Sequence, residues 1–81
     1  MSETTIEELI GIIKEEKGVQ DLDVDMLLID SGFLDSFDII TVIAKIEEHF
    51  QVSIPGEDVV PENLNRICDI VALVERLRSA L

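Results

Sequence analysis

Residues 31–37 read SGFLDSF and separate a long irregular segment from the most strongly amphipathic helix that the sequence predicts, at about residues 36–50. Asp35 is a good N-cap type and would leave Ser36 at the first helical position, where the helix dipole and free amides favour a phosphate on its outward-pointing hydroxyl. Alternatively, Ser36 is itself the cap, and local preference favours this arrangement because serine is a leading N-cap residue. Asp38 adds a carboxylate to the first turn, which the dipole also favours.

Three segments place apolar side chains at the i, i+3, i+4, i+7 spacing of an amphipathic helix. They lie at about residues 4–17, 36–50 and 65–79. Thr4 and Glu7 form a potential capping box for the first helix, Gly18 suits its end, and Asn63 or Asn65 would cap the last helix. With three Phe and no Trp or Tyr, the core should be aliphatic. Its expected members are Ile6, Leu9, Ile10, Ile13, Ile39, Val42, Ile43, Ile46, Phe50, Ile67, Ile70, Val71, Val74, Leu77 and Leu81.

The segments between these helices contribute to the predicted fold as well. Residues 18–35 are long for a connection but rich in apolar side chains, so they should pack over the core, with one helical turn near residues 24–28. Residues 57–60 read as a short helical turn that Pro61 would stop. The sequence therefore predicts an all-α fold, a small bundle of three main helices plus one short helix with a long first loop, in a single domain over residues 1–81.

The charge of the chain is strongly negative and unevenly distributed. The net charge is −12, and residues 18–60 carry −9 of it, with ten acidic side chains against Lys45 alone. Such a surface repels nucleic acid and anionic lipid and attracts basic partners in a salt-dependent way. No apolar run approaches the roughly 18 residues of a membrane span, and the first residues lack the features of a secretory signal. We therefore expect a cytoplasmic monomer that does not bind nucleic acid and does not insert into a membrane.

The residues offer no catalytic or metal site of their own. His49 and Cys68 lack the setting of a nucleophile–base pair, and Cys68 should be a buried or half-buried small residue of the last helix. No Gly-rich phosphate loop follows a strand. The alternating aspartates of residues 21–25 resemble the start of a calcium loop, but Met26 and Gly32 stand where that loop needs glycine and a bidentate glutamate. We expect a protein that is not an enzyme and holds no metal.

Three motifs together resemble the acyl carrier protein family. They are FLDSF at residues 33–37, IEEHF at residues 46–50, and VSIP at residues 52–55. The family pattern runs as an Asp-Ser-Leu-like motif, a helix ending Glu-Glu-x-Phe, and then Ile-Pro. The resemblance covers essentially the whole chain, including the helix lengths, the long first loop and the acidic character.

The resemblance implies a specific role for the SGFLDSF stretch. Ser36 matches the serine to which a separate transferase attaches 4′-phosphopantetheine, with coenzyme A as donor. The arm would carry an acyl group as a thioester, and Asp35 would then be the helix cap that helps position the serine. Asp35 and Phe37 flank the attachment point and are predicted to contribute to the cofactor site.

The resemblance also implies surfaces for partners and cargo. Loading and processing enzymes with basic docking patches would contact the outward face of the central helix, for which the candidates are Phe37, Asp38, Thr41, Ala44 and Glu48. An acyl chain could fold back between the helices into a pocket, for which the candidates are Ile43, Ile46, Phe50, Ile54, Leu64 and Cys68. For any single one of these residues, ordinary core packing is the competing interpretation.

Departures from the family pattern favour a specialised carrier. Phe37 replaces the usual Leu or Met after the serine, and Thr41 and Lys45 make the central helix less negative than in fatty acid synthesis carriers. Pro61-Glu62-Asn63 resembles an insertion. The expected cargo is an acyl intermediate of fatty acid, specialised lipid or polyketide synthesis. The alternatives are an aminoacyl carrier, of the D-alanine or peptide-synthesis type, and an unmodified acidic helical docking module.

Overall fold

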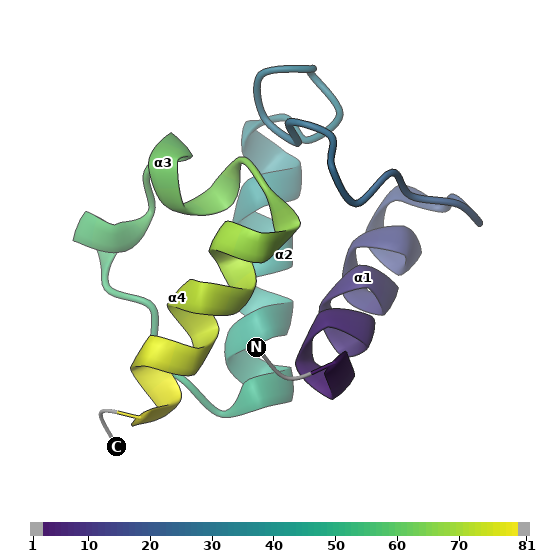
Figure 1. Ribbon diagram of the computed structural model, residues 1–81. Coiled ribbons are helices and arrows are strands. Elements are labelled where there is room, and N and C mark those ends of the chain that lie inside the picture. Colours follow the sequence, from purple (N-terminus) through teal and green to yellow (C-terminus); the bar gives the residue numbers. More distant parts are fainter. Residues whose placement is uncertain (1–2, 80–81) are drawn as a thin grey trace.

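The computed structural model describes residues 3–79 of the chain, and within that range helices are the only regular elements (Figure 1). Three helices are long and two are short, which confirms the predicted all-α class and the small bundle. The elements are α1 (Glu3–Lys17), α2 (Ser36–Phe50), the 3-10 turn η1 (Gly56–Asp58), α3 (Pro61–Leu64) and α4 (Ile67–Ser79).

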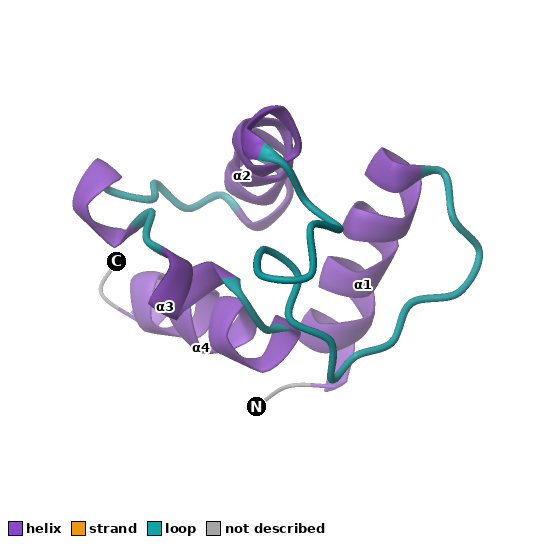
Figure 2. Cartoon of the chain, turned by 90° about the horizontal axis from the view of Figure 1, so that it is seen from above, coloured by secondary structure: helices purple, strands orange, loops and turns teal. Residues whose placement is uncertain are grey.

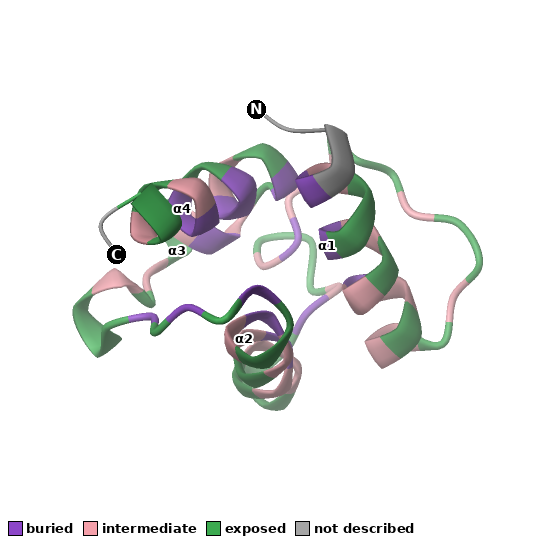
Figure 3. Cartoon of the chain, turned by 90° about the horizontal axis from the view of Figure 1, so that it is seen from below, coloured by how far each residue is buried: buried purple, intermediate pink, exposed green. Residues whose placement is uncertain are grey.

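The core forms where the apolar stripes of the three long helices meet. Helix α1 packs against both α2 and α4, and the short α3 packs against α4. Buried positions on these helices face inward, as Figure 3 shows. The buried apolar residues are aliphatic except for one Phe, as expected: Leu9, Ile13, Leu28, Leu34, Val42, Ile46, Phe50, Val52, Ile54, Leu64, Ile67, Ile70, Val71, Leu73 and Val74.

The loop between α1 and α2 swings outward and returns over the core to the start of α2 (Figure 2). Leu28 is fully buried and Leu34 nearly so. The Leu34 N–H donates to the Leu28 carbonyl at 2.8 Å, which closes a small turn just before α2. Full burial of one leucine stabilises by about 1.5–3 kcal/mol, more than the roughly 1 kcal/mol of a hydrogen bond. Apolar burial therefore holds the loop on the core, and the hydrogen bonds fix its register.

Asn65 connects this loop to the junction between α3 and α4. Its carbonyl oxygen accepts the Leu28 N–H at 2.6 Å. Its Oδ1 accepts the N–H groups of Ile29 and Asp30 at 3.0 and 3.1 Å. The predicted role of Asn65 as a cap of the last helix is therefore wrong. Its side chain is committed to the loop, and α4 begins two residues later, with the Ile70 N–H donating to the Arg66 carbonyl.

Several predicted boundaries need similar corrections. Asn63 does not cap α4 either, because it lies inside α3, four residues before α4 begins, and its Nδ2 donates to the Asp58 carbonyl at 3.0 Å. Pro61 starts α3 instead of stopping a helix, since a proline at the first helical position loses no hydrogen bond. The expected turn near residues 24–28 is a single turn closed by Met26 N–H and the Asp23 carbonyl.

Two expectations fall partly or wholly outside the described residues. Helix α1 begins at Glu3, so Thr4 lies inside the helix and not at its cap. The side chain of Thr4, on which the predicted capping box depends, is outside the described part of the structure. Leu81, predicted at the end of the apolar stripe of the last helix, also lies outside it.

The contacts of Asn65 predict a local effect of Asn65→Ala. The variant loses the acceptor for two loop N–H groups, so the free energy of unfolding should fall by about 1 kcal/mol, the usual net value for such bonds. Urea unfolding measures this, and amide exchange should accelerate at residues 29 and 30. Asn63→Ala is the matched control, because it removes one hydrogen bond from the same region without touching the loop. Equal exchange at residues 29 and 30 in both variants would contradict the assignment.

Candidate functional site

A reciprocal pair of hydrogen bonds starts helix α2. Asp35 is the N-cap residue, with extended backbone angles of φ −93° and ψ −175°. Its Oδ1 accepts the Asp38 N–H at 2.8 Å, and Asp38 Oδ2 accepts the Asp35 N–H at 3.1 Å. This is a capping box, with aspartate in place of the usual glutamate at the third position. The sequence allowed either Asp35 or Ser36 as the N-cap, and in the structure Asp35 is the cap.

Ser36 is therefore the first residue of the helix and not its cap. The residue is exposed. Its hydroxyl makes no hydrogen bond with any other residue in the described range 3–79, because the capping oxygen comes from Asp35. An exposed hydroxyl at this position can be modified without removing a bond that the fold needs, and the helix N-terminus favours a negatively charged substituent.

The turn that leads into this site depends on a glycine. Gly32 has φ +83°, a left-handed conformation that residues with a Cβ rarely adopt, and its N–H donates to the Ile29 carbonyl at 3.0 Å. The Phe33 N–H then donates to Ser31 Oγ at 3.3 Å. The chain thus reverses immediately before Asp35, so that Ser36 lies at the end of the bundle.

Asp38 is not the outward-facing residue that the sequence predicted. Its Oδ2 accepts a hydrogen bond from Lys17 Nζ, the last residue of α1, at 2.8 Å, and its side chain is only 16% exposed. The Lys17 ammonium also lies 5.5 Å from the centroid of the Phe33 ring. Helical periodicity could not show this contact, because it depends on where α1 ends relative to α2.

The pair shifts the titration of both groups. The hydrogen bond from Lys17 is the main cause that lowers the pKa of Asp38, and the Asp35 N–H acts in the same direction. The same hydrogen bond raises the pKa of Lys17, with weaker contributions from the negative charges of Asp38, Asp35 and Glu16. Both groups are therefore charged throughout the neutral range.

The rest of the predicted docking face is more apolar than expected. Phe37 is 83% exposed, and Ala44 and Glu48 are exposed, whereas Thr41 is half-buried. Ile40, which the sequence analysis did not assign to this face, is 67% exposed. Its spacing of three residues from Phe37 was the available signal. Beside Ser36, α2 therefore presents an apolar pair and not a carboxylate.

Other charged residues of α2 pair with α1. Lys45 Nζ lies 3.2 Å from Glu16 Oε1 and 3.9 Å from Glu15 Oε1. His49 Nε2 lies 3.5 Å from Glu8 Oε2, which gives this histidine a structural partner at the helix end. These contacts leave Glu48 as the exposed carboxylate of the predicted face.

The six candidate pocket residues differ in how far they are buried. Four are buried in the core: Ile46, Phe50, Ile54 and Leu64. Ile43 is half-buried. The prediction that Cys68 is buried or half-buried is wrong, because it is exposed one position past the buried Ile67. Cys68 borders a separate small cavity of about 160 Å³. The five apolar candidates therefore pack in or against the core, and Cys68 does not.

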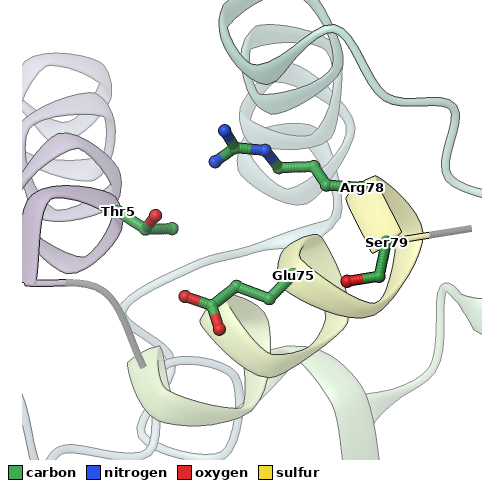
Figure 4. A pocket seen from close by; sticks show the side chains of 4 residues that line it. All are labelled: Thr5, Glu75, Arg78 and Ser79. Carbon is green, nitrogen blue, oxygen red and sulfur yellow. The ribbon is translucent and has the colours of Figure 1, made fainter. Parts of the chain in front are cut away.

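A shallow hollow lies elsewhere, between the start of α1 and the end of α4 (Figure 4). It is lined by Thr5, Glu75, Arg78 and Ser79. Thr5 is twelve residues before Lys17, or about 18 Å along an α-helix, so this hollow is separate from the Ser36 site. Within residues 3–79, no group of three or more metal-ligating side chains is placed to hold an ion. None of the described helices is long and apolar enough to cross a membrane.

Comparison with known proteins points to one family. Residues 6–74 match the family described as "Phosphopantetheine attachment site". An acyl carrier protein of Akkermansia muciniphila is 31% identical, over 98% of this chain and 100% of the relative. An acyl carrier protein of Kineococcus radiotolerans is 38% identical over 88% of each chain. One from Rhodococcus erythropolis is 29% identical, over 95% of this chain and 85% of the relative. No solved structure gives a significant match.

The shifted pKa of Asp38 predicts a pH-dependent effect of Asp38→Asn. A carboxyl whose pKa is lowered by folding stabilises above its unfolded value of about 3.9, and this contribution is lost as the pH falls through the folded value. Asp38→Asn should therefore be less stable than the parent at pH 7, and the difference should narrow as the pH falls below about 4 toward the lowered pKa at which the folded parent protonates Asp38.

Chemical unfolding at a series of pH values measures this difference. Asp21→Asn is the control, because Asp21 is an exposed loop carboxylate without an ion pair to any residue in the described part of the chain. The assigned pairing would be contradicted if the loss of unfolding free energy in Asp38→Asn were independent of pH, or no larger than the loss in Asp21→Asn.

Proposed function

Because this chain belongs to the phosphopantetheine-attachment family of acyl carrier proteins, we propose that Ser36 is its attachment point and that it delivers acyl groups to enzymes of fatty acid, specialised lipid or polyketide synthesis. Proteins of this family are carriers and not catalysts, and they hold 4′-phosphopantetheine covalently. The observation that carries the assignment to Ser36 is its exposed hydroxyl at the start of α2, which the capping box leaves without a structural role.

The residues around Ser36 fit such a group. Modification would join Ser36 Oγ to the phosphorus of the arm, release the nucleotide part of coenzyme A and transfer the hydroxyl proton to a base of the transferase. When bound, the arm supplies the thiol that holds an acyl group as a thioester. The start of α2 favours the added negative charge, and Lys17 offsets the charge of the neighbouring Asp38. Asp35 remains exposed at the same turn, available to the metal or basic groups of a transferase.

The docking surface that we propose combines the predicted residues with one addition. The remaining candidates for partner contact are Phe37, Thr41, Ala44 and Glu48. Ile40 is added to them because its side chain is exposed. Asp38 is a weaker candidate because Lys17 covers its carboxylate. The net charge of −9 over residues 18–60 should attract enzymes with basic docking patches. Phe37 and Ile40 favour close apolar contact with a partner beside the serine.

The relatives favour acyl over aminoacyl cargo, because each of the three is an acyl carrier protein. A dedicated pathway is supported by the departures from the family pattern, of which Phe37 is the clearest. The Phe37 side chain is also the most exposed large apolar side chain in the described range.

The attachment site is tested by mass. Co-expression with a phosphopantetheinyl transferase, followed by intact-mass spectrometry, should show the addition of one phosphopantetheinyl group. Ser36→Ala should abolish the addition, whereas Ser31→Ala, which changes an exposed serine of the loop before α2, should leave it. An unmodified parent chain, or addition that persists in Ser36→Ala, would falsify the assignment.

The docking surface is tested by a matched pair of apolar truncations. Phe37→Ala should raise the KM of the transferase for this carrier about tenfold, the usual effect of truncating an anchor residue, without changing the helical circular dichroism signal. Val59→Ala, an exposed apolar residue outside α2, should have no effect. Equal KM values for the two variants would remove Phe37 from the docking surface.

A further inference from the structure

The contact between Lys17 and Asp38 joins residues that are 21 positions apart in the sequence, at the point where α1 ends and α2 begins. The Nζ–Oδ2 distance is 2.8 Å, and the two side chains are 26% and 16% exposed. The other ion pairs among the described residues are longer, from 3.2 to 3.9 Å. None of those longer pairs reaches the first turn of α2.

The contact acts on the same oxygen that closes the capping box. Asp38 Oδ2 accepts from Lys17 Nζ and also from the backbone N–H of Asp35. Without Lys17, the Asp38 carboxylate is free to change rotamer and leave the Asp35 N–H. The backbone at residue 35 fixes where Ser36 begins the helix. Loss of Lys17 would therefore affect Ser36 through two hydrogen bonds, the one from Lys17 Nζ to Asp38 and the one from the Asp35 N–H to Asp38.

Several neighbouring residues fix the position of Lys17. Gly18 has φ +66° and ends α1 directly after Lys17. The Phe33 ring lies beside the ammonium, so that Lys17 also contacts the turn that precedes the site. Asp35 and Glu16 add nearby negative charges that keep the ammonium at this junction.

We propose that Lys17 is a positioning residue for the modification of Ser36: by holding Asp38 in the capping box, it keeps the serine hydroxyl in the orientation that the transferase uses. The proposal rests on the proposed function of Ser36 and adds to it a residue from another helix. Lys17 does not touch the reacting atoms, so its effect should pass through Asp38.

The test compares charge-matched variants of α1. Lys17→Gln should lower the single-turnover rate of phosphopantetheinylation at saturating transferase about five- to tenfold, since a small misplacement of a reacting group is costly. Lys17→Arg, which can still pair with Asp38, should restore most of the rate. Lys14→Gln removes the same charge one turn earlier, from a lysine without an ion pair to any described residue, and should leave the rate unchanged.

Two further measurements separate positioning from a general loss of charge or stability. In the Asp38→Ala background, Lys17→Gln should have little additional effect, because the acceptor of the Lys17 ammonium is already lost. Amide exchange in Lys17→Gln should accelerate at Asp35 and Asp38 but not at core residues such as Ile13 and Ile46. Both measurements are made under conditions where circular dichroism shows every variant folded.

The outcomes distinguish this proposal from the one on which it rests. If the parent chain is not modified, or Ser36→Ala still is, the function assigned to Ser36 fails. If Ser36 is modified but Lys17→Gln reacts as fast as Lys14→Gln, only the role of Lys17 is overturned. The same conclusion follows if Lys17→Gln has its full effect in the Asp38→Ala background.

Discussion

The capping box between Asp35 and Asp38 is the interaction on which the presentation of Ser36 depends. A helix start leaves backbone N–H groups without partners, and most N-cap residues satisfy them with a single side chain. Here two carboxylates share the task, each accepting the backbone N–H of the other's residue. A serine that starts a helix usually serves as the cap. Because the aspartates take that role, Ser36 is available for chemistry performed by another protein.

This arrangement is supported from both sides of the bundle. From the junction between α3 and α4, Asn65 fixes residues 28–30, and Leu28 in turn accepts the Leu34 N–H one residue before the cap. From α1, Lys17 reaches Asp38. The loop between these anchors contributes Leu28 and Leu34 to the core, so its irregular backbone is held by burial as well as by hydrogen bonds. Both burial and hydrogen bonds in the loop therefore contribute to the position of Ser36.

What the sequence could predict follows from the range of each interaction. Helical periodicity is local, so the three long helices, most of their buried faces and the end of α1 at Gly18 were predicted correctly. The motif resemblance placed Asp35 in the capping role, where local preference alone favoured Ser36. Asn65 was misassigned because its partners lie more than thirty residues away in the chain. Asp38 was misassigned to the outward face for a similar reason, because its partner Lys17 lies on another helix and helical spacing does not reveal how two helices are aligned. Cys68 and Ile40 lie at the borders of apolar stripes, where one position decides between core and surface.

The ion pairs between α1 and α2 have a consequence for how these antiparallel helices are aligned. Along α1, the residues that pair with α2 are acidic at Glu8, Glu15 and Glu16 and basic at Lys17. On α2, His49 pairs with Glu8, Lys45 pairs with Glu15 and Glu16, and Asp38 pairs with Lys17. The change of sign at the end of α1 makes the pattern asymmetric. Sliding α1 in one direction would bring Glu16 toward Asp38, and sliding it in the other would bring Lys17 toward Lys45. Both displacements place like charges together, whereas apolar stripes alone tolerate such shifts. The charge pattern therefore selects one register for the helix pair and disfavours its neighbours.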